Sequence, residues 1–198
     1  MLKIAALVSG GGTNLQAILD AMDSGIIKNA EISIVVSTNG HAYALKRAEI
    51  RGINTVVLAK KDFANNCDRE KALLDILSQN NIELVVLCGC MMVLSPAFIE
   101  GWDKPIINVH PSLLPAHGGR GFYGLRVHEA VLAAGDAITG ATVHFVDGGI
   151  DTGSIILQKE VAVKMGDTPE ILQKRVMEQA EWIILPQAIA EISEKFGR

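Results

Sequence analysis

Short apolar runs alternate with longer amphipathic segments through the first 110 residues of this 198-residue chain, and this alternation constrains the fold most strongly. Continuous apolar runs of about five residues are typical of strands buried on both faces, and the segments between them have helical periodicity. Strands and helices in alternation form a parallel sheet with helices on both faces. The pattern therefore predicts an α/β, Rossmann-like, open and mostly parallel sheet.

The expected elements follow the chain in order. Strands are predicted at residues 4–8, 32–36, 54–58, 84–88 and 106–109. Helices are predicted at residues 13–23, 43–51 and 62–79, with a further helical piece from Ser95-Pro96, where serine caps and proline takes the first helical position. The run at residues 84–88 is the most apolar, so we expect it at the centre of the sheet.

Beyond His110 the pattern changes. Residues 116–124 contain four glycines in nine positions, which predicts an irregular loop, and a helix is expected at residues 125–134. Strands at residues 140–146 and 154–163 are joined by a short link, so they should be antiparallel and extend one end of the sheet. A final helix from Thr168-Pro169 is expected to turn one apolar face to the core: Leu172, Val176, Ala180, Ile183 and Ile184.

Composition and charge exclude several classes of protein. The 49% hydrophobic content suits one large core, so residues 1–198 are predicted to form a single domain. The N-terminal apolar run is short and indicates a first strand and not a signal peptide, and no run approaches the ~18 residues that span a bilayer. We therefore expect a cytoplasmic protein without a membrane partner. A net charge of −4 argues against a nucleic-acid partner.

The cysteines do not indicate a metal site. Cys67, Cys88 and Cys90 are odd in number, and the Cys88-Gly89-Cys90 spacing lacks the further Cys or His ligands that zinc needs. We expect buried, reduced thiols and no bound metal.

Two polar residues end the strand predicted before His110. Asn108 and His110 lie two apart, so they project from the same face if the strand continues that far. A histidine can hold a proton near neutral pH and an asparagine amide can donate to a developing oxyanion, which suits acyl transfer. Pro111 and Pro115 end the ladder and direct the following loop. The alternative is a strand end that carries polar residues without a chemical role.

The segment Ser9-Gly10-Gly11-Gly12-Thr13-Asn14 follows the first strand and opens a helix, where free N–H groups can hold a phosphate. A dinucleotide fingerprint would need a third glycine where Leu15 stands, and a Walker loop would need a lysine after Gly12. The loop therefore suits a monophosphate better than a nucleotide cofactor. The alternative is a tight glycine turn in which Thr13 caps the helix.

Two acidic residues share the glycine-rich link between the last two strands. In an open α/β sheet this link should lie near the carboxyl edge, close to His110 and the first glycine loop. Asp147 or Asp151 could then stabilise a charged His110 or assist proton transfer, although taken alone each is more typical of a turn residue. His144 is expected to be a structural side chain or one that supports the site residues without contacting the substrate. His41, His117 and His128 are expected in polar or helix-surface positions without a role.

Several motifs together resemble the folate-dependent formyltransferases. They are Ser9 to Asn14, Met91 with Leu94-Ser95-Pro96, the Asn108-Val109-His110-Pro111-Ser112-Leu113-Leu114-Pro115 block, the run from Gly140 to Val146, and Asp151-Thr152-Gly153 through Leu157-Gln158. The likeness extends from end to end. The Asn-x-His block with a later Asp is specific to this superfamily, and the glycine loop is similar to the branch that acts on a phosphorylated purine precursor.

The resemblance implies transfer of a formyl group from 10-formyltetrahydrofolate, a co-substrate, to the amine of glycinamide ribonucleotide in purine biosynthesis. The resemblance also implies that neither a metal nor a nucleotide cofactor takes part. It implies that Asn108 and His110 stabilise the tetrahedral oxyanion while Asp151 keeps His110 charged and assists proton transfer. The partners would be small molecules, with the enzyme acting as a monomer or a homodimer.

The resemblance also implies two binding sites. Gly12, Thr13 and Asn14 would hold the phosphate of the ribonucleotide, and Glu181 would contact its ribose hydroxyls. The slot for the pterin would be formed by two short segments: Met91, Met92, Val93 and Leu94, and the backbone of Val146, Asp147, Gly148, Gly149, Ile150 and Asp151.

Two departures from the family pattern leave alternatives open. Many relatives carry an arginine where this chain has Met92, and residues 117–126 are longer and richer in glycine, with an Arg120-Gly121 similar to that of methionyl-tRNA formyltransferases. Those enzymes carry a further C-terminal domain for tRNA, which this acidic chain ending at Arg198 is expected to lack. A formyltetrahydrofolate hydrolase is a second alternative among the enzymes, but it would normally carry an N-terminal regulatory domain, whereas this sequence opens on the first predicted strand. A non-catalytic module that binds a phosphorylated ligand is the alternative outside the enzymes.

Overall fold

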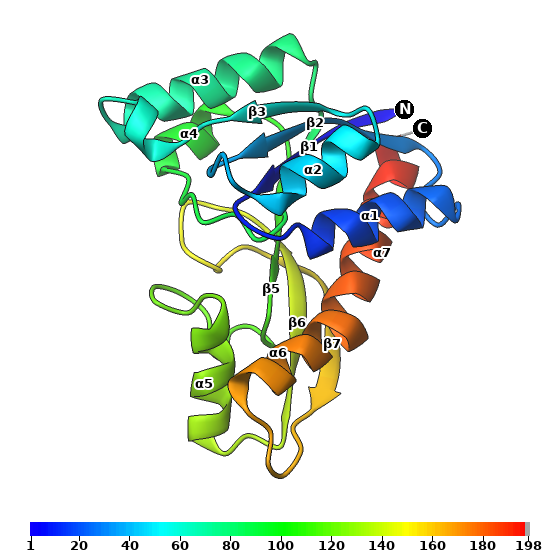
Figure 1. The fold of residues 1–198 in the computed structure, drawn as a ribbon, viewed down its shortest axis with the longest axis vertical. Coiled ribbons are helices and arrows are strands. Elements are labelled where there is room, and N and C mark those ends of the chain that lie inside the picture. The colour runs from blue at the N-terminus through cyan, green and yellow to red at the C-terminus, as the bar shows by residue number, and fades with distance from the viewer. Residues whose placement is uncertain (197–198) are drawn as a thin grey trace.

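The computed structural model describes residues 1–196 of the chain (Figure 1). Its strands are β1 (Leu2–Val8), β2 (Ala30–Ser37), β3 (Asn54–Val57), β4 (Leu84–Leu87), β5 (Ile106–His110), β6 (Ile138–Phe145) and β7 (Ile155–Ala162). Its α-helices are α1 (Thr13–Asp23), α2 (Tyr43–Ile50), α3 (Asn66–Gln79), α4 (Pro96–Gly101), α5 (Leu125–Ala134), α6 (Pro169–Val176) and α7 (Trp182–Phe196). None of these helices is long and apolar enough to cross a membrane.

All seven strands form one sheet in the order β3-β2-β1-β4-β5-β6-β7. The pairs from β3 to β5 are parallel, whereas β6 runs antiparallel to both β5 and β7. The predicted α/β sheet with an antiparallel extension is therefore confirmed. The apolar strand β4 lies at its centre, as expected from its composition.

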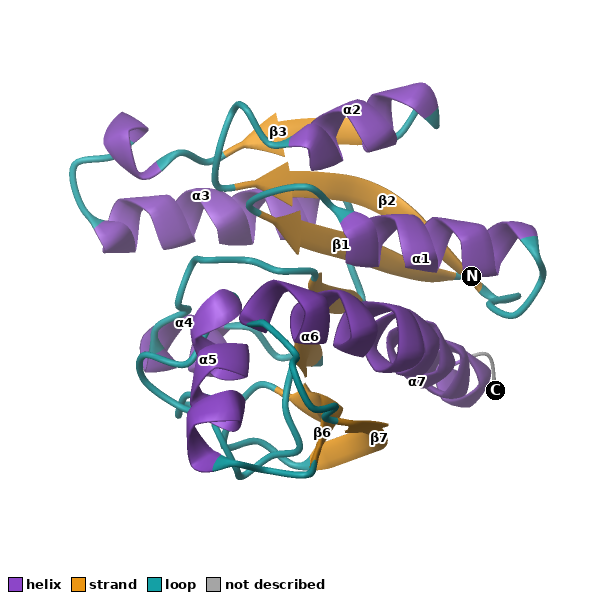
Figure 2. Ribbon diagram, turned by 60° about the horizontal axis from the view of Figure 1, so that its bottom comes forward, coloured by secondary structure: helices purple, strands orange, loops and turns teal. Residues whose placement is uncertain are grey.

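Successive side chains of the inner strands enter two separate cores. In β1, Ile4 and Ala6 pack on one face of the sheet, and Ala5 and Leu7 pack on the other. Helices α1, α2 and α7 contribute to the first core, and α3 and α4 contribute to the second, so both faces are covered (Figure 2). Burial on both faces explains why these strands are continuous apolar runs in the sequence.

Helix α3 begins later than predicted. Its expected start was Asp62, but residues Lys60–Asp62 form a 3₁₀ turn and the α-helix begins at Asn66. The Asn65 side chain accepts a hydrogen bond from the Asp68 N–H at 2.9 Å and caps the first turn. Asparagine at a cap satisfies a free N–H group, so it fixes the helix start independently of the charged residues before it.

The final helix is interrupted by a π turn at Met177–Glu181, which the sequence analysis did not predict. A π turn is wider than an α turn, so residues spaced by four, among them Val176, Ala180 and Ile184, stay buried on one side. Ile183 was predicted on the same face, and this prediction was wrong, because its side chain is 39% exposed.

Close packing at Gly140 joins the turn after His110 to the antiparallel strands. Gly140 of β6 pairs with Glu160 of β7. A Cβ atom at Gly140 would overlap the Lys159 carbonyl oxygen and would lie 2.7 Å from Leu113 Cδ2. Leu113 belongs to the Pro-Ser-Leu-Leu-Pro turn, so a side chain at position 140 would displace the segment that leaves β5.

Replacing Gly140 with alanine should therefore lower the free energy of unfolding by about 2 kcal/mol or more, the usual effect of overpacking a core. Urea unfolding followed by circular dichroism measures the change. Gly101→Ala is the matched control, because a Cβ there meets open space at the end of α4. Equal stabilities for Gly140→Ala and the unsubstituted protein would contradict the packing described.

Candidate active site

The carboxyl end of β5 carries the polar pair found in the sequence. Ile107 and Val109 face one core, so the strand alternation turns Asn108 and His110 to the opposite side. The neighbouring antiparallel strand pairs His144 directly with Asn108. The expected common face of Asn108 and His110 is thus confirmed, and β6 adds a second histidine beside them.

The link between β6 and β7 returns Asp151 to this histidine pair. Its Oδ2 atom lies 3.4 Å from His110 Nδ1, and its Oδ1 atom lies 3.6 Å from His144 Nε2. The Gly119 N–H donates to Oδ2 at 3.0 Å. Asp151 has a φ of 58°, a left-handed conformation that aspartate tolerates better than most residues. The expected proximity of Asp151 and His110 is confirmed.

Asp151 is held as a carboxylate. Burial raises its pKa, but the neighbouring His144 and His110 rings and the Gly119 N–H outweigh burial, so the pKa lies below its ordinary value. The site therefore contains one fixed negative charge in contact with two imidazoles.

Both ring nitrogens of His110 face hydrogen-bond acceptors. Nε2–H donates to the His117 carbonyl oxygen at 2.8 Å, and Nδ1 faces the Asp151 carboxylate. Burial lowers the pKa of His110, and Asp151 and the His117 carbonyl raise it without fully compensating. The ring is therefore neutral at pH 7, and both nitrogens would have an acceptor if it gained a proton.

His144 orients the amide of Asn108. The Phe145 carbonyl can only accept, so His144 Nδ1–H donates to it at 2.8 Å and Nε2 accepts from Asn108 Nδ2 at 3.2 Å. This bond uses one of the two amide protons of Asn108. The other proton remains available to a substrate.

His128 was placed on a helix surface by the sequence analysis, and this was wrong. It is fully buried on α5, because α5 packs against the core along the face that carries Val127 and Val131. Burial, and to a smaller extent the charge of a protonated His110, lowers the pKa of His128 to about 4. Neither ring nitrogen has a partner among residues 1–196. The ring is therefore neutral and contributes no charge beside His110.

The cysteines and acidic residues of the described chain form no metal cluster: no group of three or more His, Cys, Asp or Glu side chains in residues 1–196 is arranged around a common centre. Cys88 is buried and Cys67 is exposed, so the expectation of buried thiols was wrong for Cys67. Burial raises the pKa values of Cys88 and Cys90, which keeps both as thiols.

The glycine loop after β1 is fixed by its contact with α2. Gly12 has a φ of 72° and precedes the first turn of α1. A Cβ atom on Gly12 would lie 2.6 Å from Ala44 Cβ, so only glycine allows the loop to approach α2 this closely. Thr13 caps nothing with its side chain, since α1 has no side-chain cap hydrogen bond, which removes the capping alternative.

Asn14 and Glu181 form a buried pair that links α1 to the π turn. Asn14 Nδ2 donates to Glu181 Oε2 at 2.8 Å, and Asn14 Oδ1 has no partner among the described residues. The Asn14 amide is thus directed to Glu181 in this structure. Burial raises the pKa of Glu181 to about 6, and the Asn14 bond opposes this only partly. Gly12, Thr13, Asn14 and Glu181 therefore lie in one region, although 167 positions separate Asn14 from Glu181.

The predicted pterin slot begins beyond β4 with an irregular segment held at both ends. The Met91 N–H donates to Ser9 Oγ at 2.7 Å, and Glu70 accepts from the Ser95 N–H and hydroxyl at 2.8 and 2.6 Å. Met91 and Val93 are exposed, whereas Met92 and Leu94 are buried. Met92 is uncharged and packs in the second core, so it cannot make the charged contact with a ligand that an arginine at this position could make.

Residues 146–150, the other predicted wall of the slot, form a tight turn. Asp147 accepts from the Gly149 N–H and from the Thr152 hydroxyl, and its side chain is exposed. The reading of Asp147 as a turn residue therefore holds. Val146 is half-buried and packs in the second core, while Ile150 is exposed.

Some contacts in the site have no signal in the sequence. His117 and Gly119 act through backbone atoms, so no side-chain pattern reveals them. Ser9 and Glu70 hold the slot segment from distant parts of the chain: Glu70 is marked by no motif, and the motif that contains Ser9 indicates a phosphate loop and not a contact with Met91.

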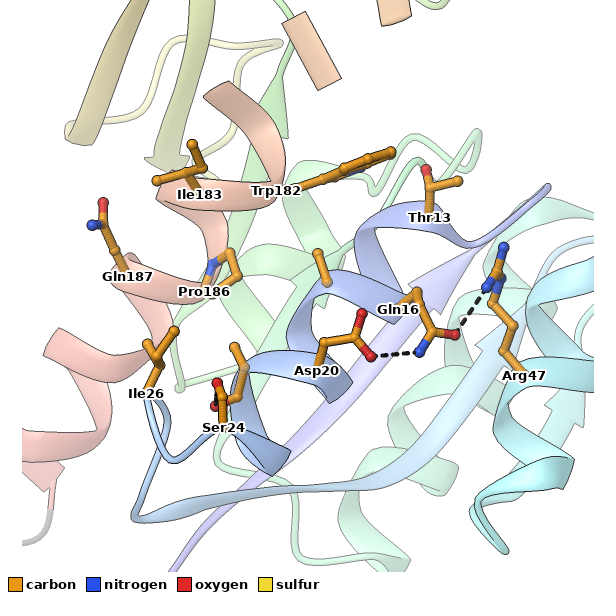
Figure 3. Close-up of a pocket in the computed structure, with 12 residues that line it drawn as sticks. Thr13, Gln16, Asp20, Ser24, Ile26, Arg47, Trp182, Ile183, Pro186 and Gln187 are labelled. Atoms are coloured by element: carbon orange, nitrogen blue, oxygen red, sulfur yellow. Dashed lines mark hydrogen bonds between the residues drawn. The ribbon is translucent and has the colours of Figure 1, made fainter. Parts of the chain in front are cut away.

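A groove of about 700 Å³ opens beside the glycine loop (Figure 3). It runs between α1 and α7 from Thr13 and Trp182 to Ile26 and Gln187. Figure 3 shows the Trp182 ring extending from α7 towards Thr13, so the indole forms the wall next to the loop.

The buried carboxyl of Glu181 should make stability depend on pH. Its pKa rises from 4.5 to about 6 on folding, so the stabilisation by the bound proton is complete below pH 4.5 and is lost as the pH rises through 6. Glu181→Gln removes this titration. The stability of the variant relative to the unsubstituted protein should therefore increase by about 2 kcal/mol between pH ~4 and ~7.5 in denaturant unfolding. A difference that does not change with pH would contradict the raised pKa.

Comparison with known proteins places this geometry in a family. A sequence model of the family described as formyl transferase matches residues 2–189. The phosphoribosylglycinamide formyltransferase of Haemophilus influenzae is 41% identical over 194 residues, which cover 98% of this chain and 88% of the relative. The trifunctional purine biosynthetic protein adenosine-3 of Gallus gallus is 41% identical over 187 residues, 94% of this chain, but the chain spans only 18% of that relative's length.

Solved structures of similar proteins share the fold. Glycinamide ribonucleotide transformylase 1 from Symbiobacterium toebii superposes with a TM-score of 0.91 at 37% identity, covering 98% of this chain and 89% of that one. Phosphoribosylglycinamide formyltransferase from Coxiella burnetii, in complex with CHES, gives 0.89 at 38% identity, covering 98% and 88%. With its sequence matched almost throughout and its fold shared at this level, the chain belongs to the formyl transferase family.

Proposed function

We propose that this chain transfers the formyl group of 10-formyltetrahydrofolate to the amine of glycinamide ribonucleotide, a step of purine biosynthesis. The observation that carries the proposal is the convergence of Asn108, His110 and Asp151 at the carboxyl edge of the sheet. The names of the similar proteins support the same acceptor and the transfer of a formyl group.

In the proposed reaction the amine nitrogen attacks the formyl carbon and forms a tetrahedral intermediate. His110, neutral in the free site, takes up the proton that the amine loses on attack, and the resulting imidazolium and the free amide proton of Asn108 stabilise the oxyanion as charge develops. The bond between the formyl carbon and N10 of the folate then breaks, and the proton lost by the amine is delivered to N10.

Asp151 is proposed to lower the free-energy cost of protonating His110. Burial alone lowers the pKa of His110, and the carboxylate 3.4 Å from Nδ1 opposes this effect. When charge develops on the substrate, the imidazolium has the carboxylate on one nitrogen and the His117 carbonyl on the other. The pair formed by the His110 imidazolium and the Asp151 carboxylate supports proton transfer from the amine to N10 of the folate.

The two substrates are proposed to enter from different sides. The ribonucleotide phosphate would bind at Gly12, Thr13 and Asn14, and the ribose hydroxyls would meet Glu181, whose buried carboxyl already has one amide partner. The pterin would lie between residues 91–94 and residues 146–151, where exposed apolar side chains such as Met91 and Val93 are available to cover the ring.

The proposal predicts turnover of glycinamide ribonucleotide with 10-formyl-5,8-dideazafolate, followed by the absorbance of the released folate. The purified chain should exceed the spontaneous rate without added metal. No turnover above that rate would overturn the enzyme assignment. Turnover only with charged initiator tRNA would replace the proposed acceptor.

Asp151→Asn should lower kcat by about two orders of magnitude or more, because an amide cannot stabilise the imidazolium, while both KM values change little. Asp103→Asn is the control, since Asp103 is exposed before the start of β5, at the opposite end of that strand from His110. Activity of Asp151→Asn near that of the unsubstituted protein would show that Asp151 is misassigned, and Asp147 would then be tested.

A further inference from the structure

Arg47 of α2 lies against the glycine loop and has no part in the chemistry described above. Figure 3 shows its guanidinium at the same end of the groove as Thr13. We propose that Arg47 is a positioning residue that aims the N–H groups of this loop at the phosphate of the substrate and supplies a compensating charge. This inference rests on the proposed function, which places a phosphate at the loop.

The guanidinium bridges the loop and the helix that follows it. Arg47 Nε–H donates to the Gly11 carbonyl oxygen at 2.9 Å, and Nη1–H donates to Gln16 Oε1 at 2.9 Å. The Tyr43 ring lies under the guanidinium, 5.0 Å from Cζ to the ring centroid. These contacts fix the guanidinium plane next to the first turn of α1.

A second contact from α2 holds the preceding carbonyl. The Ala44 N–H donates to the Gly10 carbonyl oxygen at 3.1 Å. Helix α2 thus binds two successive carbonyl groups of the loop, those of Gly10 and Gly11.

Peptide geometry converts these carbonyl contacts into an orientation for donors. In a trans peptide the C=O of one residue and the N–H of the next lie in one plane and point in opposite directions. When α2 holds the carbonyls of Gly10 and Gly11, the N–H groups of Gly11 and Gly12 point away from α2. Within residues 1–196, neither of these N–H groups, nor that of Thr13, donates to another backbone or side-chain atom. Three successive free donors of this kind form an anion-binding nest.

The charge of Arg47 is not neutralised within the described chain. Arg51 pairs with Asp23, Arg175 with Asp167, and Lys46 with Glu49, but Arg47 contacts no carboxylate. Its two side-chain hydrogen bonds go to a carbonyl and an amide. In a chain with net charge −4, an uncompensated guanidinium beside the nest favours a dianionic phosphate there.

The test uses ribose 5-phosphate as the probe, because its binding requires no formyl transfer. In isothermal titration calorimetry, Arg47→Met should weaken binding by about tenfold or more, the loss expected for one charge-assisted contact. Arg47→Lys should recover part of this loss, because it restores the charge without the fork that holds the Gly11 carbonyl. Arg51→Met is the matched control: it removes the same charge from the end of α2 without touching the loop, and it should bind as the unsubstituted protein does.

Steady-state kinetics separates positioning from general damage. Arg47→Met should raise KM for the ribonucleotide and leave KM for the folate and kcat unchanged, whereas a loss of fold would lower kcat as well. Equal ribose 5-phosphate binding by Arg47→Met and the unsubstituted protein would overturn the inference while leaving the proposed function intact. If the unsubstituted protein bound no ribose 5-phosphate, both the inference and the phosphate assignment would fail.

Discussion

The antiparallel pairing of β5 with β6 is the interaction on which the candidate site depends. Its register sets His144 opposite Asn108, and the link that follows β6 is then long enough to return Asp151 to His110. A shift by one residue would turn Asn108 and His110 into the apolar core that now holds Ile107 and Val109. Burial of those two side chains therefore fixes the orientation of the chemical groups between them.

The sequence predicted most of the fold because its signals are local. Runs buried on both faces, capped helix starts such as Ser95-Pro96, and the glycine-rich link before β7 each carry their own evidence in neighbouring residues. The start of α3 and the exposure of Ile183 were mispredicted, because a cap at Asn65 and a π turn each override a simple periodicity. Such features depend on one hydrogen bond or one added residue, and a periodicity read over a whole helix does not detect them.

The sequence identified the residues of the candidate site, but it did not specify most of the contacts between them. Asn108 and His110 could be paired from their spacing, but Asp151 reaches them across 40 intervening residues, and no local pattern specifies that approach. The burial of His128 and the bond between Asn14 and Glu181 depend on how α5 and the π turn pack. Backbone partners such as the His117 carbonyl carry no side-chain signature.

The π turn at Met177–Glu181 also changes the direction in which side chains project between α6 and α7. Each residue added to an α-helix rotates the following side chains by about 100° about the axis. The wider turn therefore lets α6 pack against α5 and β6, while α7 packs against α1 and against β6 and β7. The same device places Glu181 at the joint, where the side chain meets Asn14. Removing a single residue from the joint would rotate the two halves against each other and separate the carboxyl from the glycine loop, even if every strand remained in place.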